Sequence, residues 1–223
     1  MPINDSTEEI FNTIYERNLW GKSEDSTIKF YSGDGSHDPT IVSPYVNVVS
    51  TFLLFYRLIS NKPANVVDLG CGDFAVGSKI RHLCDRYVAC DIVAPLIEHN
   101  KVKFQSLNVE FKTLDLATYD LPNGDIVFVR QVFQHLTNDQ IKNALINIQS
   151  TYKYLVLTEH IPSAHNFTAN IEIPNIGDWR MSLNSGVVVT DPPFNLEYVE
   201  RINLCQARQY GGIISTILYK LAH

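Results

Sequence analysis

Residues Val66–Phe74 read VVDLGCGDF, and this stretch decides the fold. Its apolar beginning predicts a short buried strand, and Gly70 and Gly72 allow a tight turn that a ligand can approach closely. The residues that follow predict a helix beginning near Phe74, whose first N–H groups have no partner inside the helix. A strand, a glycine-bearing turn and a helix in this order predict a nucleotide-type site at the carboxyl end of a parallel sheet.

Strand-like and helical patterns alternate along the chain on the C-terminal side of this stretch. Runs of ten or more helical residues between strands are typical of an α/β fold with a parallel, doubly wound sheet. The last two runs lie on either side of Tyr210–Gly212 and predict an antiparallel hairpin. The expected strands are residues 66–70, 86–92, 109–115, 125–131, 154–160, 198–209 and 211–221, and the expected later helices are 94–104 and 137–152.

The segment before the first strand predicts two helices joined by a long polar loop. Ile10, Phe11, Ile14 and Tyr15 share one face of the first helix. The loop, residues 21–39, is too long to be a simple connection and indicates a functional role. The second helix is expected from Ser43 or Pro44 to Ser60. The whole chain is expected to be one domain, made of residues 1–60 (helices and lid loop), 61–160 (cofactor-binding core), 161–197 (substrate-region insertion) and 198–223 (hairpin).

Composition limits the partners and the compartment. The 223 residues carry a formal net charge of −6 with no basic run, which argues against a nucleic-acid substrate. The four cysteines form no C-x-x-C pair and the N-terminal residues lack a signal-peptide pattern, so we expect free thiols in the cytoplasm. The apolar stretch 42–59 is interrupted by polar residues and Arg57, which favours a buried helix over a membrane span.

Acidic residues at the ends of the expected strands indicate the ligand. Asp91 follows Gly70 by 21 residues, and an ionised carboxylate there can accept both hydrogen bonds from a ribose diol. Asp115 and Leu116 end the third strand, where a base edge could lie. Residues 70–75 also satisfy the dinucleotide pattern G-x-G-x-x-G/A, so the local motif fits two cofactors. Three features argue against the dinucleotide. Asp68 stands where a dinucleotide site usually has an apolar residue, and Asp73 would repel a pyrophosphate. The terminal antiparallel hairpin is atypical of a dinucleotide domain.

With these motifs the sequence resembles the class I S-adenosylmethionine-dependent methyltransferases. VVDLGCGDF, YVACDI, FKTLDL, DIVFVRQVFQHL and YLVLTEH stand in the order of five family motifs. The resemblance implies a Rossmann-like sheet of seven strands in the order 3-2-1-4-5-7-6, with strand 7 antiparallel. Trp20-Gly21 and Ser32–Ser36 resemble the W-G…S-G-x-G-S segment of a small-molecule subgroup, which implies an N-terminal helical lid. Some members of that subgroup are associated with surface-polysaccharide synthesis.

The same resemblance implies S-adenosylmethionine as cofactor and S-adenosylhomocysteine as product. The residues expected to bind the cofactor are Trp20, Ser32, Gly33, Asp68, Gly70, Cys71, Gly72, Asp73, Phe74, Asp91, Ile92, Asp115, Leu116, Arg130 and Gln131.

Methyl transfer to an alcohol benefits from a positioned base, so polar side chains at the carboxyl end of the sheet are candidates. His135, Glu159 and His160 are the candidate catalytic residues. The expected substrate-binding residues are Tyr31, Asp178, Trp179, Arg180 and Phe194, with Arg180 able to hold a phosphate or carboxylate. No metal site is expected, since Arg130–Val132 after the fourth strand contains no acid.

The sequence therefore predicts a methyltransferase that acts on an oxygen or nitrogen of a small polar metabolite, such as a sugar, a nucleotide-sugar or a phosphorylated compound. The alternatives are an NAD(P)-dependent oxidoreductase and a non-catalytic S-adenosylmethionine-binding protein. We expect a small-molecule acceptor as partner, no nucleic acid or membrane, and a monomer or homodimer.

Overall fold

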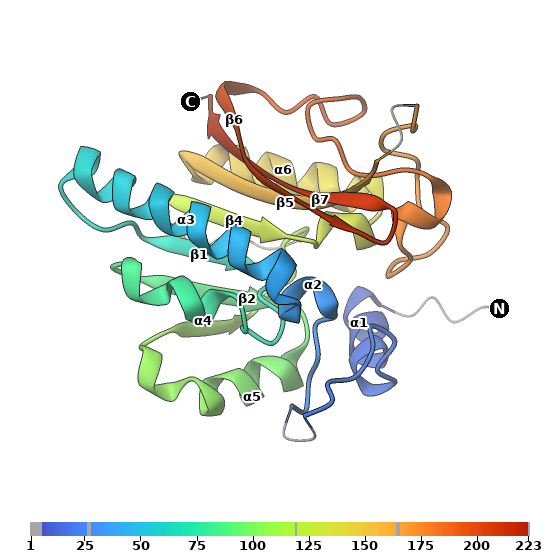
Figure 1. Ribbon diagram of the computed structural model, residues 1–223, viewed down its shortest axis with the longest axis horizontal. Coiled ribbons are helices and arrows are strands. Elements are labelled where there is room, and N and C mark those ends of the chain that lie inside the picture. The colour runs from blue at the N-terminus through green and yellow to red at the C-terminus, as the bar shows by residue number, and fades with distance from the viewer. Residues whose placement is uncertain (1–5, 26–27, 119, 164–165, 223) are drawn as a thin grey trace.

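One mixed sheet organises the chain in the computed structural model, which describes residues 6–25, 28–118, 120–163 and 166–222. Its strands lie in the order β3-β2-β1-β4-β5-β7-β6 (Figure 1). All neighbours are parallel except β7, which pairs antiparallel with both β5 and β6. The strand order and the antiparallel strand confirm the fold class expected from the sequence. The strands are β1 Val66–Leu69, β2 Tyr87–Asp91, β3 Glu110–Thr113, β4 Ile126–Arg130, β5 Tyr154–Pro162, β6 Tyr198–Gln209 and β7 Gly212–Leu221.

Helices cover both faces of the sheet. In Figure 1, α3 crosses in front of the sheet, α6 lies behind it, and α1 and α2 lie together at one end of it. The buried residues form two clusters accordingly, one between α6 and the sheet and one between α3, α4 and the sheet. The helices are α1 Thr7–Glu16, α2 Asp34–His37, α3 Pro39–Ser60, α4 Gly77–Ile80, α5 Ala94–Lys103 and α6 Asn138–Thr151, with short 3₁₀ turns at Arg81–Leu83, Gln105–Leu107, Phe133–His135 and Arg180–Leu183.

The strand order creates the crevice that the sequence predicted. β2 and β4 lie on opposite sides of β1, so the connections after β1 and β4 leave the sheet in different directions. Ligands bind at such a switch point in open α/β sheets. Asp68 lies near the carboxyl end of β1, paired with Ala89 of β2 on one side and Phe128 of β4 on the other.

Two helix beginnings differ from the sequence-based expectation. α3 begins at Pro39 rather than at Ser43 or Pro44, because the Asp38 side chain accepts a hydrogen bond from the Thr40 N–H at 2.8 Å and caps the helix. Pro44 is accommodated within the helix. α4 begins at Gly77 rather than near Phe74, because Phe74 has a φ of 59° and cannot belong to a right-handed helix.

The long helix α3 has a buried face and an exposed face. Tyr45, Val49 and Leu53 are buried against the sheet, as a core helix requires. Phe55 and Leu58 on the outer face are more than half exposed, which the apolar sequence did not predict. By length and composition alone α3 could cross a membrane, although 39% of its most apolar window is buried inside the protein.

Candidate cofactor and acceptor site

A cavity of about 880 Å³ opens at the carboxyl ends of the central strands, beneath α1 and α2. It brings together most of the residues that the sequence singled out. The predicted site residues that line it are Trp20, Ser32, Gly33, Asp68, Gly70, Cys71, Gly72, Asp73, Asp91, Ile92, Asp115, Leu116, Arg130, Gln131, His135, His160, Asp178 and Trp179. Five others lie outside its lining: Tyr31, Phe74, Glu159, Arg180 and Phe194.

The backbone N–H groups of residues 70–73 in the glycine loop already have acceptors within the protein. The N–H groups of Gly70 and Cys71 both donate to the carbonyl oxygen of Cys90, at 2.8 and 2.9 Å. The Gly72 N–H donates to Asp91 Oδ2 at 3.0 Å, and the Asp73 N–H donates to Ser32 Oγ at 2.9 Å. A pyrophosphate is normally held by free N–H groups at this position. This loop offers none from residues 70–73.

The predicted lid loop is attached to the glycine loop through Asp73. Ser32 N–H donates to Asp73 Oδ2 at 3.1 Å, and the Asp73 N–H returns a bond to Ser32 Oγ. His37 Nε2 lies 2.5 Å from the same carboxylate oxygen. Tyr15 of α1 contacts Ser32 Oγ at 2.9 Å, so α1, the lid loop and the glycine loop form one hydrogen-bonded unit.

Asp91 and Asp115 stand where a nucleoside would lie. Asp91 accepts from the N–H groups of Gly72 and Val93, one on each carboxylate oxygen, and each oxygen keeps a second acceptor site. Burial raises the pKa of Asp91, and these backbone bonds oppose the shift. Asp115 accepts from the Ala117 N–H at 2.9 Å.

A buried acid, Asp68 of β1, lies close enough to Arg130 of β4 to feel its charge. Burial raises the pKa of Asp68 to about 7, although the Tyr87 hydroxyl donates to it at 2.9 Å and Arg130 is nearby. Arg130 contacts lid residues, donating to the Gly35 carbonyl and, at 3.5 Å, to Ser36 Oγ. Its Nε is buried and has no partner in the described residues.

The two candidate histidines differ in how many ring nitrogens make hydrogen bonds among the described residues: both in His135 and one in His160. His135 Nδ1 donates to the Asp178 carbonyl at 3.2 Å, and its Nε2 lies 3.1 Å from Gln134 Nε2, which donates to it. Burial lowers the pKa of His135 to about 4, which keeps the ring neutral. His160 Nε2 donates to the Gln209 carbonyl at 2.9 Å, which leaves Nδ1 with its lone pair. Burial lowers the pKa of His160 as well.

Glu159 supports the site from behind. Its two carboxylate oxygens accept from the N–H groups of Phe133 and Gln134, at 3.1 and 3.0 Å. These bonds fix the 3₁₀ turn that carries Gln134 and His135. Burial raises the pKa of Glu159 to about 8, and the two backbone bonds oppose the shift.

Arg180 does not face the cavity, contrary to what a phosphate-binding role requires. Its guanidinium is fully buried in the insertion and donates to the carbonyl oxygens of Ile171 and Leu136 and to Asn138 Oδ1. Tyr31 stacks on His37 at 4.4 Å and donates to Asp34. Phe194 packs against the main hydrophobic cluster.

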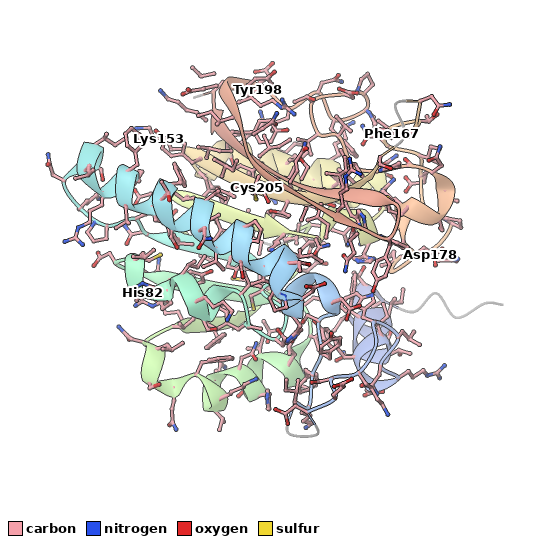
Figure 2. All side chains as sticks on the ribbon, viewed as in Figure 1. His82, Lys153, Phe167, Asp178, Tyr198 and Cys205 are labelled. Carbon is pink, nitrogen blue, oxygen red and sulfur yellow. The ribbon has the colours of Figure 1, made fainter. Side chains whose placement is uncertain are left out.

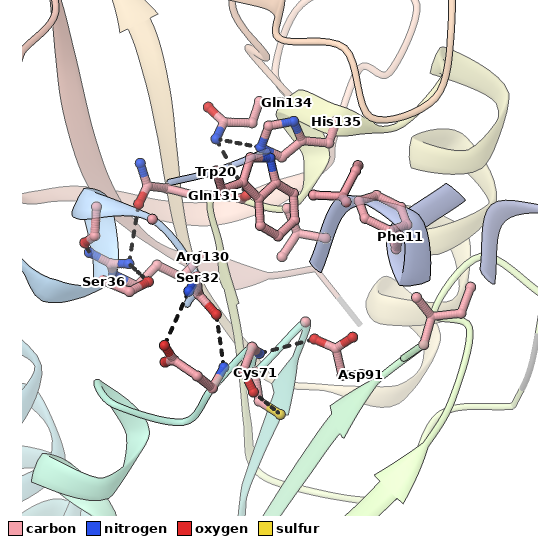
Figure 3. Close-up of a pocket in the computed structure, with 18 of the residues that line it drawn as sticks. Phe11, Trp20, Ser32, Ser36, Cys71, Asp91, Arg130, Gln131, Gln134 and His135 are labelled. Carbon is pink, nitrogen blue, oxygen red and sulfur yellow. Dashed lines mark hydrogen bonds between the residues drawn. The ribbon is translucent and has the colours of Figure 1, made fainter. Parts of the chain in front are cut away.

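Phe11, Gln134 and Tyr210 also line the cavity, although the sequence did not indicate them as site residues. Figure 3 shows the Trp20 ring between Phe11 and His135, at centroid distances of 6.0 and 5.2 Å. Phe11 belongs to the amphipathic face of α1, which could have indicated it, but that face reads equally as core. Gln134 and Tyr210 had no signal, because a polar side chain after a strand and a tyrosine in a hairpin turn are common.

The cysteines and the possible metal ligands were located among the described residues. The four cysteines are free thiols. No group of three or more His, Cys, Asp or Glu side chains in residues 6–25, 28–118, 120–163 and 166–222 is placed to hold a metal ion.

The sheet order and the cavity at its switch point define the class I methyltransferase fold. Residues 66–153 match the family described as a methyltransferase domain. The matched range includes the glycine loop, Asp91 and Asp115. The fold that the resemblance to the class I S-adenosylmethionine-dependent methyltransferases implied is thereby confirmed. No curated protein matches the sequence.

Solved structures share the fold at low sequence identity. The N-methyltransferase NodS from Bradyrhizobium japonicum WM9, in complex with S-adenosylhomocysteine, is 18% identical with a TM-score of 0.63, over 98% of this chain and 100% of NodS. The magnesium protoporphyrin IX methyltransferase ChlM from Synechocystis PCC 6803, with bound S-adenosylmethionine, is 14% identical with a TM-score of 0.61, over 99% and 100%. The bifunctional kinase-methyltransferase WbdD is 16% identical with a TM-score of 0.60, over 84% and 41%.

Proposed function

We propose that this protein is an S-adenosylmethionine-dependent methyltransferase that acts on an oxygen or nitrogen of a small polar metabolite. The observation that carries the proposal is the glycine loop, whose N–H groups are engaged while carboxylates surround it. Sugars and nucleotide-linked sugars are the acceptors that the sequence suggested. A phosphorylated acceptor is less well supported, because Arg180 faces away from the cavity.

The charges of the lining fit a cationic cofactor better than an anionic one. Six carboxylates and a single arginine line the cavity in the described residues, whereas S-adenosylmethionine carries a sulfonium and an ammonium against one carboxylate. NAD and NADP carry a pyrophosphate, which these carboxylates would repel. The carboxylates belong to Asp34, Asp68, Asp73, Asp91, Asp115 and Asp178, and the arginine is Arg130.

The residues present provide partners for each part of the cofactor. Asp91 would accept from the ribose hydroxyls, and Asp115 with Leu116 would contact the adenine. The Arg130 Nε, buried without a partner, would donate to the α-carboxylate, while Asp68 would accept from the ammonium. When bound, S-adenosylmethionine supplies the electrophilic methyl group and its thioether leaving group.

The protein must then position the acceptor, exclude water and remove a proton. Trp20 and α1 cover the cavity and exclude water from it. We assign the general base to His160 rather than His135, because His160 keeps a ring nitrogen free while the Gln209 carbonyl orients its ring. Both ring nitrogens of His135 are engaged. Glu159 holds the neighbouring turn and lies outside the lining.

Thermal unfolding with ligands tests the cofactor. A ligand at 100 times its dissociation constant stabilises the folded state by about 2.7 kcal/mol, which shifts the melting temperature measurably. We expect stabilisation by S-adenosylhomocysteine and none by NAD or NADP. Stabilisation by a dinucleotide alone would transfer the assignment to an oxidoreductase.

Turnover distinguishes an enzyme from a protein that only binds the cofactor. Formation of S-adenosylhomocysteine from S-adenosylmethionine in the presence of a metabolite extract is expected. Once an acceptor is found, His160→Gln should lower kcat by about 10²–10⁴-fold while binding of S-adenosylhomocysteine is retained. An equally active His160→Gln variant would remove the base assignment.

A further inference from the structure

The cavity extends beyond the region that the cofactor would fill. Because β5 and β7 lie on the far side of β4 from β1 and β2, residues carried by β5 and the β6–β7 turn line a separate half of it. We call this the acceptor half and define it by Asp34, Gln134, His160, Asp178, Trp179 and Tyr210. Figure 2 shows Asp178 at the same end of the molecule as the β6–β7 turn.

Aromatic rings form one wall of the acceptor half. The Trp179 ring lies 5.4 Å from His160 and 6.2 Å from Tyr210, measured between ring centroids. Indole and phenol rings present a negative face, which attracts a cation within about 6 Å. Such a wall also covers the apolar side of a sugar-sized molecule.

Two carboxylates accompany this wall: Asp34 contacts Tyr210, and Asp178 precedes Trp179 in the chain and lines the same cavity. Asp34 accepts from the hydroxyls of Tyr31 and Tyr210, so each of its oxygens keeps one acceptor site. Asp178 Oδ2 accepts from the backbone and side chain of Asn175, while no hydrogen bond involves its Oδ1 among the described residues. Hydrogen bonds from Tyr210 and Tyr31 hold the pKa of Asp34 below its usual range, so it is ionised at neutral pH.

A buried hydrogen-bond acceptor in this half has no partner. Gln134 is 5% exposed, and its amide nitrogen donates to His135 Nε2 at 3.1 Å. Its Oε1 is buried and makes no hydrogen bond in the described residues. A buried polar atom without a partner costs about 1–3 kcal/mol, so a ligand that donates a hydrogen bond here would gain from it.

Positive charge is missing from the acceptor half. Arg130 is the one lysine or arginine in the described lining, and its guanidinium already contacts Gly35 and Ser36 of the lid. The residues that the structure leaves undescribed include no lysine or arginine. A phosphate or carboxylate on the acceptor would therefore meet two carboxylates and no free cation.

We propose that the methyl acceptor carries a protonated amine, which the acceptor half recognises through Asp34, Asp178 and the aromatic wall. This inference deepens the proposed function and rests on it, because it takes the remainder of the cavity as the S-adenosylmethionine site. The ammonium is the recognition group. It donates to the carboxylates and lies against Trp179, while the atom that receives the methyl group is the one nearest His160.

Tryptophan fluorescence gives a direct test, because the chain has two tryptophans and both line the cavity. The protein is titrated with glucosamine, glucose and glucose 6-phosphate at constant ionic strength, with and without S-adenosylhomocysteine. These probes share a hexose and differ in charge. We expect a saturable change with glucosamine, at least tenfold weaker binding of glucose, and no binding of the phosphate. The Trp179→Phe variant should lose most of the signal.

Charge-removing variants identify the partners of the amine. Asp178→Asn and Asp34→Asn should each weaken glucosamine binding several-fold and leave the affinity for S-adenosylhomocysteine unchanged. Glu197→Gln removes one carboxylate outside the lining, beside Tyr198, which Figure 2 places far from Asp178, and should have no effect. Tighter binding of glucose 6-phosphate than of glucosamine, or no binding of glucosamine, would overturn the proposal. Failure to bind S-adenosylhomocysteine would instead count against the proposed function.

Discussion

Ser32 and Asp73 hydrogen-bond each other twice across 41 residues of sequence, with Ser32 N–H donating to Asp73 Oδ2 at 3.1 Å and Asp73 N–H donating to Ser32 Oγ at 2.9 Å. This reciprocal pair joins the lid loop to the loop that follows β1. Asp73, which argues against a pyrophosphate, therefore has a structural role of its own. The two loops therefore separate only when both Ser32–Asp73 hydrogen bonds break.

Ser32→Ala should loosen the lid. The substitution leaves the Asp73 N–H and the Tyr15 hydroxyl without their common partner, at a cost of about 1–3 kcal/mol. We expect faster amide hydrogen exchange in residues 28–38 and roughly tenfold weaker binding of S-adenosylhomocysteine. Ser43→Ala, at an exposed position of α3, is the matched control. Unchanged exchange in the variant would mean that the pair does not hold the lid.

Asp91→Ala should weaken cofactor binding without unfolding the protein. The carboxylate would be lost as acceptor for the ribose hydroxyls, which corresponds to about 1–3 kcal/mol of binding free energy. Isothermal titration with S-adenosylhomocysteine measures the effect, and far-ultraviolet circular dichroism checks the fold. Asp85→Ala removes an exposed acid from the turn before β2 and should bind normally. Equal affinities for the two variants would contradict the ribose assignment.

The strands and the residues that line the cavity around the glycine loop could be predicted because local signals suffice for them. Val66–Leu69 is continuous and buried, and Thr137 with Gln140 forms the capping box that begins α6. Strand order followed from the family resemblance rather than from periodicity. These features depend on residues close together in sequence, where spacing is informative.

The acceptor half could be predicted only in part, since it depends on contacts between distant segments. Asp34 meets Tyr210 across 176 residues, and no local pattern encodes that contact. Arg180 was expected to bind substrate because a guanidinium can hold a phosphate or carboxylate. Its guanidinium instead donates to the carbonyl oxygens of Ile171 and Leu136. The sequence alone does not show whether an arginine is buried in this way or exposed at the surface.

Arg180→Met should test whether this arginine is structural. The variant leaves the carbonyl groups of Ile171 and Leu136 without their buried donor, so we expect the free energy of unfolding to fall by about 3 kcal/mol. Urea unfolding followed by circular dichroism measures the loss. Arg57→Met, on the exposed side of α3, should be nearly neutral. If Arg180→Met were as stable as the parent protein, the substrate-binding role would regain support.

His135 should make the stability of the protein depend on pH below neutrality. Burial lowers its pKa from 6.5 to about 4, so between these values the unfolded chain binds a proton that the folded protein does not. The free energy of unfolding therefore falls as the pH drops from 6.5 to 4, by an amount of the order of 3 kcal/mol. Above pH 6.5 the ring is neutral in both the folded and the unfolded chain, so His135 no longer lowers the free energy of unfolding.

His135→Gln should flatten that part of the stability curve. Asp68 and Glu159 have raised pKa values and contribute the opposite slope, so the informative quantity is the difference between the parent and variant curves. Urea unfolding at several pH values from 4 to 8 provides both curves. His82→Gln, at an exposed site outside the cavity, controls for the removal of any histidine. A difference curve that is flat from pH 4 to 6.5 would show that His135 takes up its proton as readily in the folded protein as in the unfolded chain, and its ring would then be accessible enough to compete with His160 as the base.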